Sequence, residues 1–317
     1  MALFLQLLVA GIAIGAIYSL IALGYTMVYG IIELINFAHG DIFMVGTLVS
    51  LTVLNLFGVT ESSHFSVVAV VGIMIVTCLA SILVCAVLGV VIERVAYRPL
   101  RNAPRLAPLI SAIGVSLILE DFGKFTLGLN PVSLPTILPN TPYYIGPSIY
   151  IRNTDILVIV VSVLLMLGLQ WLITRTRIGR AMRAVAQDRE AAALMGVNVD
   201  RIIAITFFIG AGLAGAAAFI YGVDISVTQF NAGFQLGLIA FTAAVLGGIG
   251  NIAGAMLGGL VIGLIQSLVL YIPDNDLPYG LPHGGLAWQQ AIVFAILILI
   301  LVFRPTGLLG QRIAEKV

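Results

Sequence analysis

A short basic segment between two long apolar stretches carries the clearest chemical pattern in the sequence. Asp188 can cap the start of a helix there, and Gly196 can end it. The helix predicted between them begins with Arg189, Glu190, Ala191 and Ala192. A small helix with a flat alanine face fits a groove on another protein. The alternative is an amphipathic helix that lies on the membrane surface with its arginines on lipid phosphates.

A second polar group, at residues 33–41, lies between the first two apolar stretches. Its candidate functional residues are Asn36, His39, Gly40 and Asp41. A charge placed in hydrocarbon costs about 2.5 to 3.5 kcal/mol on insertion scales, so ionisable groups at that depth are usually functional. An interfacial turn with solvated side chains explains the same residues equally well. His39 has no histidine partner at the spacing of a metal site, so no metal is predicted.

A third group, Gly247, Gly248, Gly250 and Asn251, interrupts a long apolar stretch. It has no charge to hold it in water, so residues 234–271 are predicted to form a broken or re-entrant helix pair. Asn251 can cap the second half-helix and leave free amides for a carboxylate. A cap without a ligand is the simpler interpretation. We assign the second and third groups to a translocation pathway.

These groups need membrane helices to position them, and the composition supplies such helices. Hydrophobic residues make up 61% of the 317 positions and charged residues 9%, whereas about a quarter of a soluble domain is charged. The apolar runs reach the roughly 20 residues that a membrane helix needs. The sequence therefore predicts an all-α polytopic membrane protein, a single transmembrane domain over residues 1–317 with about eight transmembrane helices and one or two broken or re-entrant pairs. The predicted spans are 3–29, 41–57, 65–92, 106–129, 155–174, 202–221, the broken pair within 234–271, and 288–303.

The basic residues predict the sidedness of these helices. The net charge is +1, which excludes a field that would attract nucleic acid. Thirteen of the fifteen Lys and Arg residues lie in three stretches, 94–105, 175–201 and 304–316, which the positive-inside rule places in the cytoplasm. The N-terminus is then outside and the C-terminus cytoplasmic. Residues 130–153 form an external loop, either ordered and able to contact a partner or a flexible linker.

The sequence also limits the source of energy. It contains no GxxxxGK[ST] loop, so the chain is not expected to bind and hydrolyse ATP itself. No nucleophile has a nearby base, which disfavours an enzyme. An ion-coupled secondary transporter is the competing class, and its only support is Glu120, Asp155 and Asp224.

The motifs together resemble a known family. Residues 190–196 match EAAxxxG, the loop motif of ABC importer permeases, without the IxLP ending that follows it in many of them. The chain closely resembles, over nearly its whole length, the LivH-type permease subunit of high-affinity branched-chain amino acid ABC transporters. Four ordered motifs carry this resemblance: residues 25–30 followed by 36–40, residues 92–99, residues 240–250 with 254–256, and residues 304–307.

The resemblance implies a machine of several subunits in a bacterial inner membrane. Expected partners are a second, related permease in a heterodimer, two cytoplasmic ATPase subunits that hold ATP and Mg²⁺, and an external solute-binding protein that delivers leucine, isoleucine or valine. No cofactor is expected on this chain. Relatives carry urea or short amides, which remain the alternative solutes. The helix of residues 188–196 is expected to act as a rigid lever between the ATPase and the pathway.

Overall fold

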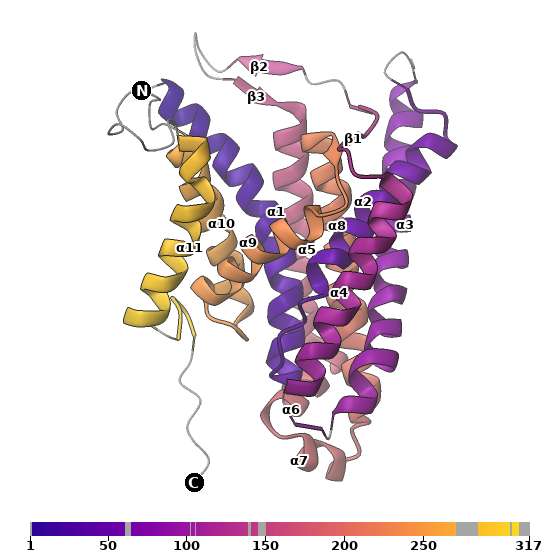
Figure 1. Cartoon of the computed structure of the whole chain (residues 1–317), viewed down its shortest axis with the longest axis vertical. Helices are drawn as coiled ribbons and strands as arrows, with labels where there is room; N and C mark the ends of the chain where they lie inside the picture. The colour runs from indigo at the N-terminus through magenta and orange to yellow at the C-terminus, as the bar shows by residue number, and fades with distance from the viewer. Residues whose placement is uncertain are drawn as a thin grey trace.

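The computed structural model describes residues 2–60, 65–101, 103–104, 106–138, 141–144, 150–270, 285–304 and 306–310. Helices dominate this part of the chain (Figure 1). They are α1 (Ala2–Ile32), α2 (His39–Leu56), α3 (Val67–Ile92), α4 (Leu106–Leu127), α5 (Asn153–Arg175), α6 (Arg177–Gln187), α7 (Arg189–Leu194), α8 (Val199–Ile225), α9 (Ala232–Gly247), α10 (Ile252–Val269) and α11 (Gly285–Phe303). The short strands are β1 (Val132–Ser133), β2 (Pro142–Tyr144), β3 (Tyr150–Arg152) and β4 (Val227–Thr228).

The described helices have the lengths and composition of a membrane bundle. Seven of them, α1 to α5, α8 and α10, are long and apolar enough to cross a membrane, and α9 and α11 are shorter apolar helices. Large apolar side chains also cover the outside of the bundle, such as Val68 at 83% exposure and Leu164 at 63%. A surface of this kind suits lipid rather than water. The prediction of an all-α polytopic membrane protein is confirmed.

Helix α1 runs through the bundle and packs closely against α10. A Cβ added at Gly15 would lie 2.9 Å from Leu260 Cα, and one at Gly263 would lie 2.3 Å from Gly15 Cα. Ser19 Oγ also donates to the Met256 carbonyl at 2.7 Å. Glycines four residues apart therefore let the two backbones touch.

Two helices, α2 and α9, begin inside the bundle rather than at its surface. After α1 ends, the chain turns at Glu33, which has a φ of 59°, and α2 starts at His39 beside Gly24 of α1. Gly24 lies eight residues before the end of α1, which is about 12 Å along a helix. The first turn of α9 meets the first turn of α2 there, because a Cβ added at Gly233 would lie 2.6 Å from the Gly40 carbonyl oxygen.

The helix bounds refine the sequence-based spans. The predicted broken pair at residues 234–271 consists of the short α9, with 16 residues, and α10, which is long enough to cross a membrane. The segment 41–57, predicted as a span, corresponds to α2, which is itself long and apolar enough to cross a membrane and follows a non-helical segment after the end of α1. Tyr271 lies outside the described residues.

The two ends of the bundle carry different elements, short helices at one end and strands at the other (Figure 1). At the lower end in Figure 1 lie α6 and α7, within the predicted cytoplasmic segment 175–201, and we call this the basic end. At the opposite end, which we call the strand end, β1 pairs with β4 and β2 pairs with β3, both antiparallel. Within the predicted loop 130–153, residues 132–133, 142–144 and 150–152 are thus held in strand pairs. Most of the basic stretch 304–316 lies outside the described residues.

Candidate coupling and translocation sites

Helix α7 begins and ends where the sequence predicted. The Asp188 carboxylate caps it by accepting from the amides of Glu190 at 3.0 Å and Ala191 at 3.1 Å. Gly196 has a φ of 84°, in the left-handed region where glycine is favoured. The Val197 amide then donates to the Ala192 carbonyl at 3.0 Å, which closes the helix. The segment contains a second helix, α6, that the sequence analysis did not predict.

Side-chain contacts fasten α7 to the bundle. Arg189 Nη2 donates to the Ile31 carbonyl at the end of α1, at 2.8 Å. Ala192 is buried at 5% exposure. Helix α6 supports α7 from the same side and buries Met182 and Val185. Helix α7 therefore contacts the end of α1 directly.

The free end of α7 is apolar. Leu194 is 88% exposed and Met195 is 85% exposed, beside the exposed Ala191 and Ala193. Exposed apolar side chains that cluster at a protruding end commonly mark a protein contact. The sequence analysis identified the alanine face but missed this tip, although the same heptapeptide contains both residues.

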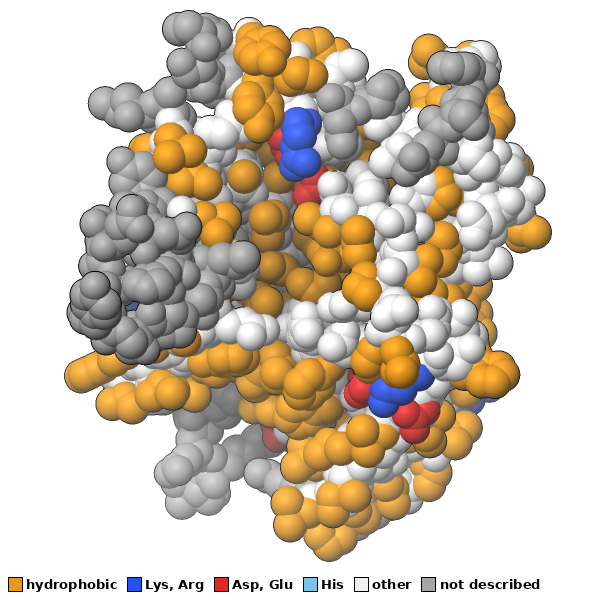
Figure 2. Space-filling model, turned by 45° about the horizontal axis from the view of Figure 1, so that its top comes forward, with side chains coloured by type: hydrophobic (Ala, Val, Ile, Leu, Met, Phe, Trp, Pro, Cys, Tyr) orange, Lys and Arg blue, Asp and Glu red, His pale blue; other side chains and the backbone are white. Residues whose placement is uncertain are grey.

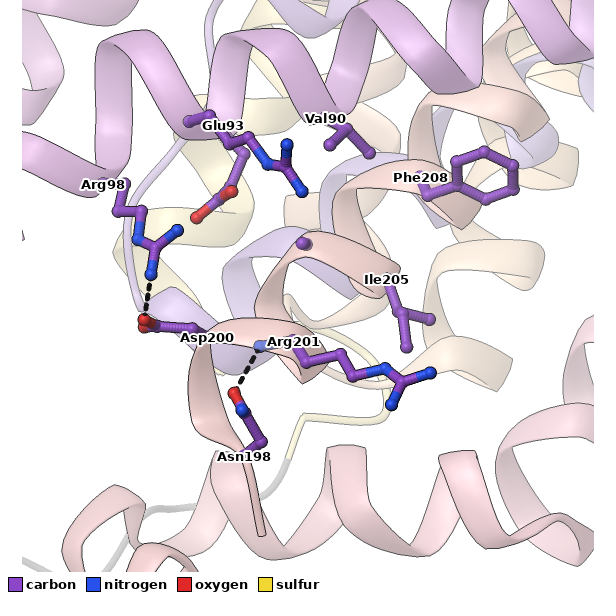
Figure 3. Close-up of a pocket in the computed structure, with 10 residues that line it drawn as sticks. Val90, Glu93, Arg98, Asn198, Asp200, Arg201, Ile205 and Phe208 are labelled. Carbon is purple, nitrogen blue, oxygen red and sulfur yellow. Dashed lines mark hydrogen bonds and ion pairs between the residues drawn. The ribbon is translucent and has the colours of Figure 1, made fainter.

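A charged cluster joins the end of α3 to the start of α8. Helix α3 continues into a π-helical turn, Glu93–Tyr97, and a 3₁₀ turn, Arg98–Leu100. Arg101 pairs with both the buried Glu93 and Asp200, and Arg98 also pairs with Asp200. Figure 3 shows Arg98 reaching from the α3 side to Asp200 on α8, and Arg201 pointing away from that pair. A pocket of about 380 Å³ lies between them. Sequence reasoning used these arginines only as markers of sidedness.

The second predicted group is buried. Asn36, His39 and Asp41 are 2%, 1% and 1% exposed. Tyr97 Oη donates to Asn36 Oδ1 at 3.0 Å, and Ser116 Oγ donates to the Asp41 carboxylate. The interpretation as a turn with solvated side chains is therefore wrong for these three residues, because neighbouring helices enclose them.

The hydrogen bonding of this group is incomplete. Among the described residues, Asn36 Nδ2, His39 Nε2 and Asp41 Oδ1 are buried without a partner. Unpaired buried polar atoms are costly, and inside a membrane they commonly mark function. Gly40 allows the close contact with α9, since a Cβ added there would lie 2.3 Å from the Gly233 carbonyl oxygen.

The third predicted group forms the turn between α9 and α10. Gly248 and Gly250 have φ values of 106° and 91°, which only glycine adopts easily. Asn251 Oδ1 accepts from the Gly254 amide at 3.1 Å, so the predicted cap is confirmed. Its Nδ2 donates to the Leu309 carbonyl at 2.7 Å.

The C-terminal segment covers part of this turn. The Leu309 amide donates to the Gly247 carbonyl at 3.0 Å, and a Cβ added at Gly248 would lie 2.5 Å from the Gly310 amide nitrogen. Gly250 and Asn251, in contrast, line an open cavity of about 470 Å³ at the basic end, beside Gly30 of α1. The predicted pathway residues thus form two separate groups, one where α2 and α9 meet and one at this turn.

The acidic residues that favoured ion coupling have basic partners. Arg152 Nη2 lies 2.6 Å from Asp155 Oδ1 and 2.8 Å from Asp224 Oδ1. These contacts, the hydrogen bond to Asp155 first, raise the pKa of the Arg152 guanidinium. Lys124 pairs with Glu120 at 3.2 Å. Figure 2 accordingly shows the charges on the strand-end face gathered in small groups where blue and red adjoin. These three acids therefore have a structural role as partners of Arg152 and Lys124.

Comparison with known proteins identifies the family. The profile of the family described as "Branched-chain amino acid transport system / permease component" matches residues 7–301. The chain therefore belongs to this family of membrane permeases.

Its relatives are similar from end to end. The chain is 43% identical to the high-affinity branched-chain amino acid transport system permease protein BraD of Pseudomonas aeruginosa, over 99% of the chain and 98% of the relative. It is 41% identical to the permease protein LivH of the corresponding system of Escherichia coli K12, with the same coverage. A more distant relative, 28% identical over 67% of the chain and 58% of its own length, is the autoinducer 2 import system permease protein LsrC of Klebsiella pneumoniae. No solved structure matches the chain.

Proposed function

We propose that this chain is one of two membrane-spanning subunits of an ABC importer for branched-chain amino acids. A solute-binding protein delivers leucine, isoleucine or valine, and a second, related permease completes a heterodimer. Two cytoplasmic ATPase subunits, which hold ATP and Mg²⁺, supply the energy, and this chain holds no cofactor. The observation that carries the proposal is α7, a capped helix fastened to α1 with an exposed apolar tip. The end-to-end similarity to BraD and LivH supports the choice of solute.

The proposal includes an orientation in a bacterial inner membrane. The basic end faces the cytoplasm, with the N-terminus outside and the C-terminus inside. Support comes from α1, which begins near the strand end and ends at the basic end (Figure 1), and from the arginines of α6 and α7 at that same end. The paired strands of residues 130–153 are then available to the solute-binding protein on the outer side.

The coupling step is a rigid movement of α7. Closure of the ATPase subunits around ATP displaces the Leu194 and Met195 tip, and the Arg189 contact passes the displacement to the end of α1. Helix α1 transmits it to α10 through their backbone contact at Gly15 and Gly263. The groups Asn36 to Asp41 and Gly247 to Asn251 adjoin the moving helices and are proposed to border the pathway.

Reconstitution tests the coupling. In vesicles that contain the full transporter, ATP should drive uptake of labelled leucine but not of labelled urea. Gly196→Arg should abolish uptake while ATP hydrolysis continues, because a side chain at a φ of 84° strains the turn that ends α7, beside its exposed tip. Unchanged uptake by this variant would refute the lever. Uptake of urea instead of leucine by the unmodified transporter would show that urea, not a branched-chain amino acid, is the solute. Transport by the purified chain alone, driven by an ion gradient, would refute the class of protein.

A matched glycine pair tests the pathway. Gly250 and Gly58 both have positive φ, 91° and 65°, and a Cβ added at either meets nothing within 4 Å. Replacement by leucine should therefore cost each about 1 kcal/mol of backbone strain. Gly250→Leu should reduce leucine uptake strongly, because Gly250 lines the cavity at the basic end. Gly58→Leu should retain uptake. Equal uptake by the two variants would show that Gly250 is needed only for the backbone turn and does not border the pathway.

A further inference from the structure

An open cavity of about 350 Å³ lies beside Ile14, Ile17 and Tyr18 of α1, away from the end of α1 that α7 contacts. Its walls come from α1, α8, α9, α10 and α11 and the segment that links α8 to α9. Figure 2 shows this end of the molecule hollowed near its centre. The volume is at the low end of the range for small-molecule sites, about 300–1,000 Å³. The space therefore suits a small solute.

Glutamine dominates the polar lining of this cavity. Five glutamines from four separate parts of the chain face it, namely Gln229, Gln235, Gln266, Gln289 and Gln290. No charged side chain belongs to the lining in the described part of the chain. Ordinary packing of apolar helices does not require five long amides to converge on one cavity, because those that are buried or partly buried there need hydrogen-bond partners.

The amides divide into fixed and available ones. Tyr18 Oη donates to Gln266 Oε1 at 2.7 Å, and Gln289 Nε2 donates to the Gln266 carbonyl at 3.3 Å. These two contacts hold Gln266 and Gln289 in the wall of the cavity. Gln235 and Gln290 are exposed at the cavity. Among the described residues, the side-chain contact of Gln235 is a long one, 3.5 Å from Gln229 Nε2. An exposed amide offers both a donor and an acceptor to a ligand.

The remaining lining is aliphatic. Ile14 and Ile17 of α1 and Leu236 and Ile239 of α9 belong to this lining. Gln235 stands on the same face of α9, near the helix start, where the helix dipole favours a negative group. A zwitterionic amino acid needs acceptors for its ammonium and donors for its carboxylate, with no net charge to balance. Neutral amides supply both, and the isoleucines supply contact for a branched side chain.

We propose that this glutamine-lined cavity binds the solute during transport, as a neutral zwitterionic amino acid with an aliphatic side chain. Gln235 and Gln290 hold the α-amino and α-carboxylate groups, and Ile14 and Ile239 contact the side chain. The inference rests on the proposed function and assigns it a specificity site. Because the site lacks fixed charges, it holds the zwitterion weakly enough to release it, and tight capture remains with the solute-binding protein.

The test compares Gln235→Leu and Gln290→Leu with Gln6→Leu in vesicles that contain the complete transporter. Gln6 is a matched control, because its amide accepts from the Tyr150 amide outside the cavity. Uptake of labelled leucine should fall about tenfold in each cavity variant, the equivalent of one lost hydrogen bond of about 1.4 kcal/mol. ATP hydrolysis stimulated by the loaded binding protein should stay within about twofold of the original, because α7 is untouched.

The outcomes separate the two proposals. Uptake by both cavity variants equal to that of the control would overturn the cavity assignment alone. A parallel loss of uptake and stimulated hydrolysis would also overturn it, since it would show a structural defect. Transport of urea instead of leucine by the unmodified protein would refute both the solute and the cavity. Ile239→Ala provides a second measure: it should shift the ratio of phenylalanine to leucine uptake by about threefold or more, and an unchanged ratio contradicts the aliphatic contact.

Discussion

Helix α8 is held at both ends by an arginine between two acids, and the two clamps differ in burial. At the strand end, Arg152 pairs with Asp155 and Asp224, whose side chains are 2% and 1% exposed. At the basic end, Arg101 pairs with Glu93, which is 1% exposed, and with Asp200, which is 49% exposed. A buried ion pair is expensive to break, whereas an exposed one contributes little. The strand end of α8 is therefore fixed, and its basic end can be rearranged at low cost.

This difference in burial fits the different roles proposed for the two ends of the bundle. The basic end contains α7 and must respond to an ATPase, so contacts that exchange readily are useful there. The strand end contains the glutamine cavity, where we propose that a defined geometry selects a solute. Substitutions of the arginines in the two clamps test this difference, because each one leaves a different number of buried carboxylates without a partner.

The largest loss is expected for Arg152→Ala. It leaves two buried carboxylates, and it also removes the Arg152 Nε contact to Asp155 Oδ2 at 3.2 Å at the start of α5. The free energy of unfolding should fall by about 3–5 kcal/mol, measured by thermal unfolding in detergent. Arg201→Ala is the control, since Arg201 forms no ion pair among the described residues, and its stability should be unchanged. If Arg152→Ala lost less stability than Arg101→Ala, the strand end of α8 would not be the more firmly held end.

A smaller loss is expected for Arg101→Ala, because only Glu93 is left buried and unpaired. We expect about 3 kcal/mol, the lower bound for a broken buried pair. Adding Glu93→Gln should restore much of it, since a neutral amide tolerates burial better than an unpaired carboxylate. The double variant keeps Asp200 paired with Arg98. If the second substitution restored no stability, the role of Glu93 as the buried partner would be wrong.

Local patterns predicted the ends of elements well. The caps at Asp188 and Asn251 and the turn at Gly196 follow from residue types three or four positions apart, and the structure has them. The apolar runs likewise predicted most spans, because length and hydropathy are set by the lipid rather than by neighbouring helices. These features depend on contacts within one element.

Features that need contacts between distant elements were missed. The depth of His39 depends on Gly24 of α1, where the absence of a side chain leaves room for the imidazole. Arg101 and Asp200 meet across 99 positions, and no spacing rule links them. The glutamines of the cavity lie in four parts of the chain, so no local pattern in the sequence links them. Exposure of the α7 tip also depends on where α6 and α1 hold the helix.

The smallest loss is expected for Arg98→Ala. Its ion pair with Asp200 is half exposed on both sides, at 50% and 49%, so water screens it and its contribution is about 0–1 kcal/mol. Asp200 also keeps Arg101 as a partner. The informative measurement is therefore the double variant with Arg101→Ala. Because both arginines share one carboxylate, the two losses of stability should not add. The loss in the double variant should exceed the sum of the two single losses by about 0.5 kcal/mol or more. Strict additivity would mean that the two arginines act independently, and the basic end of α8 would then be held by separate contacts rather than by one exchangeable clamp.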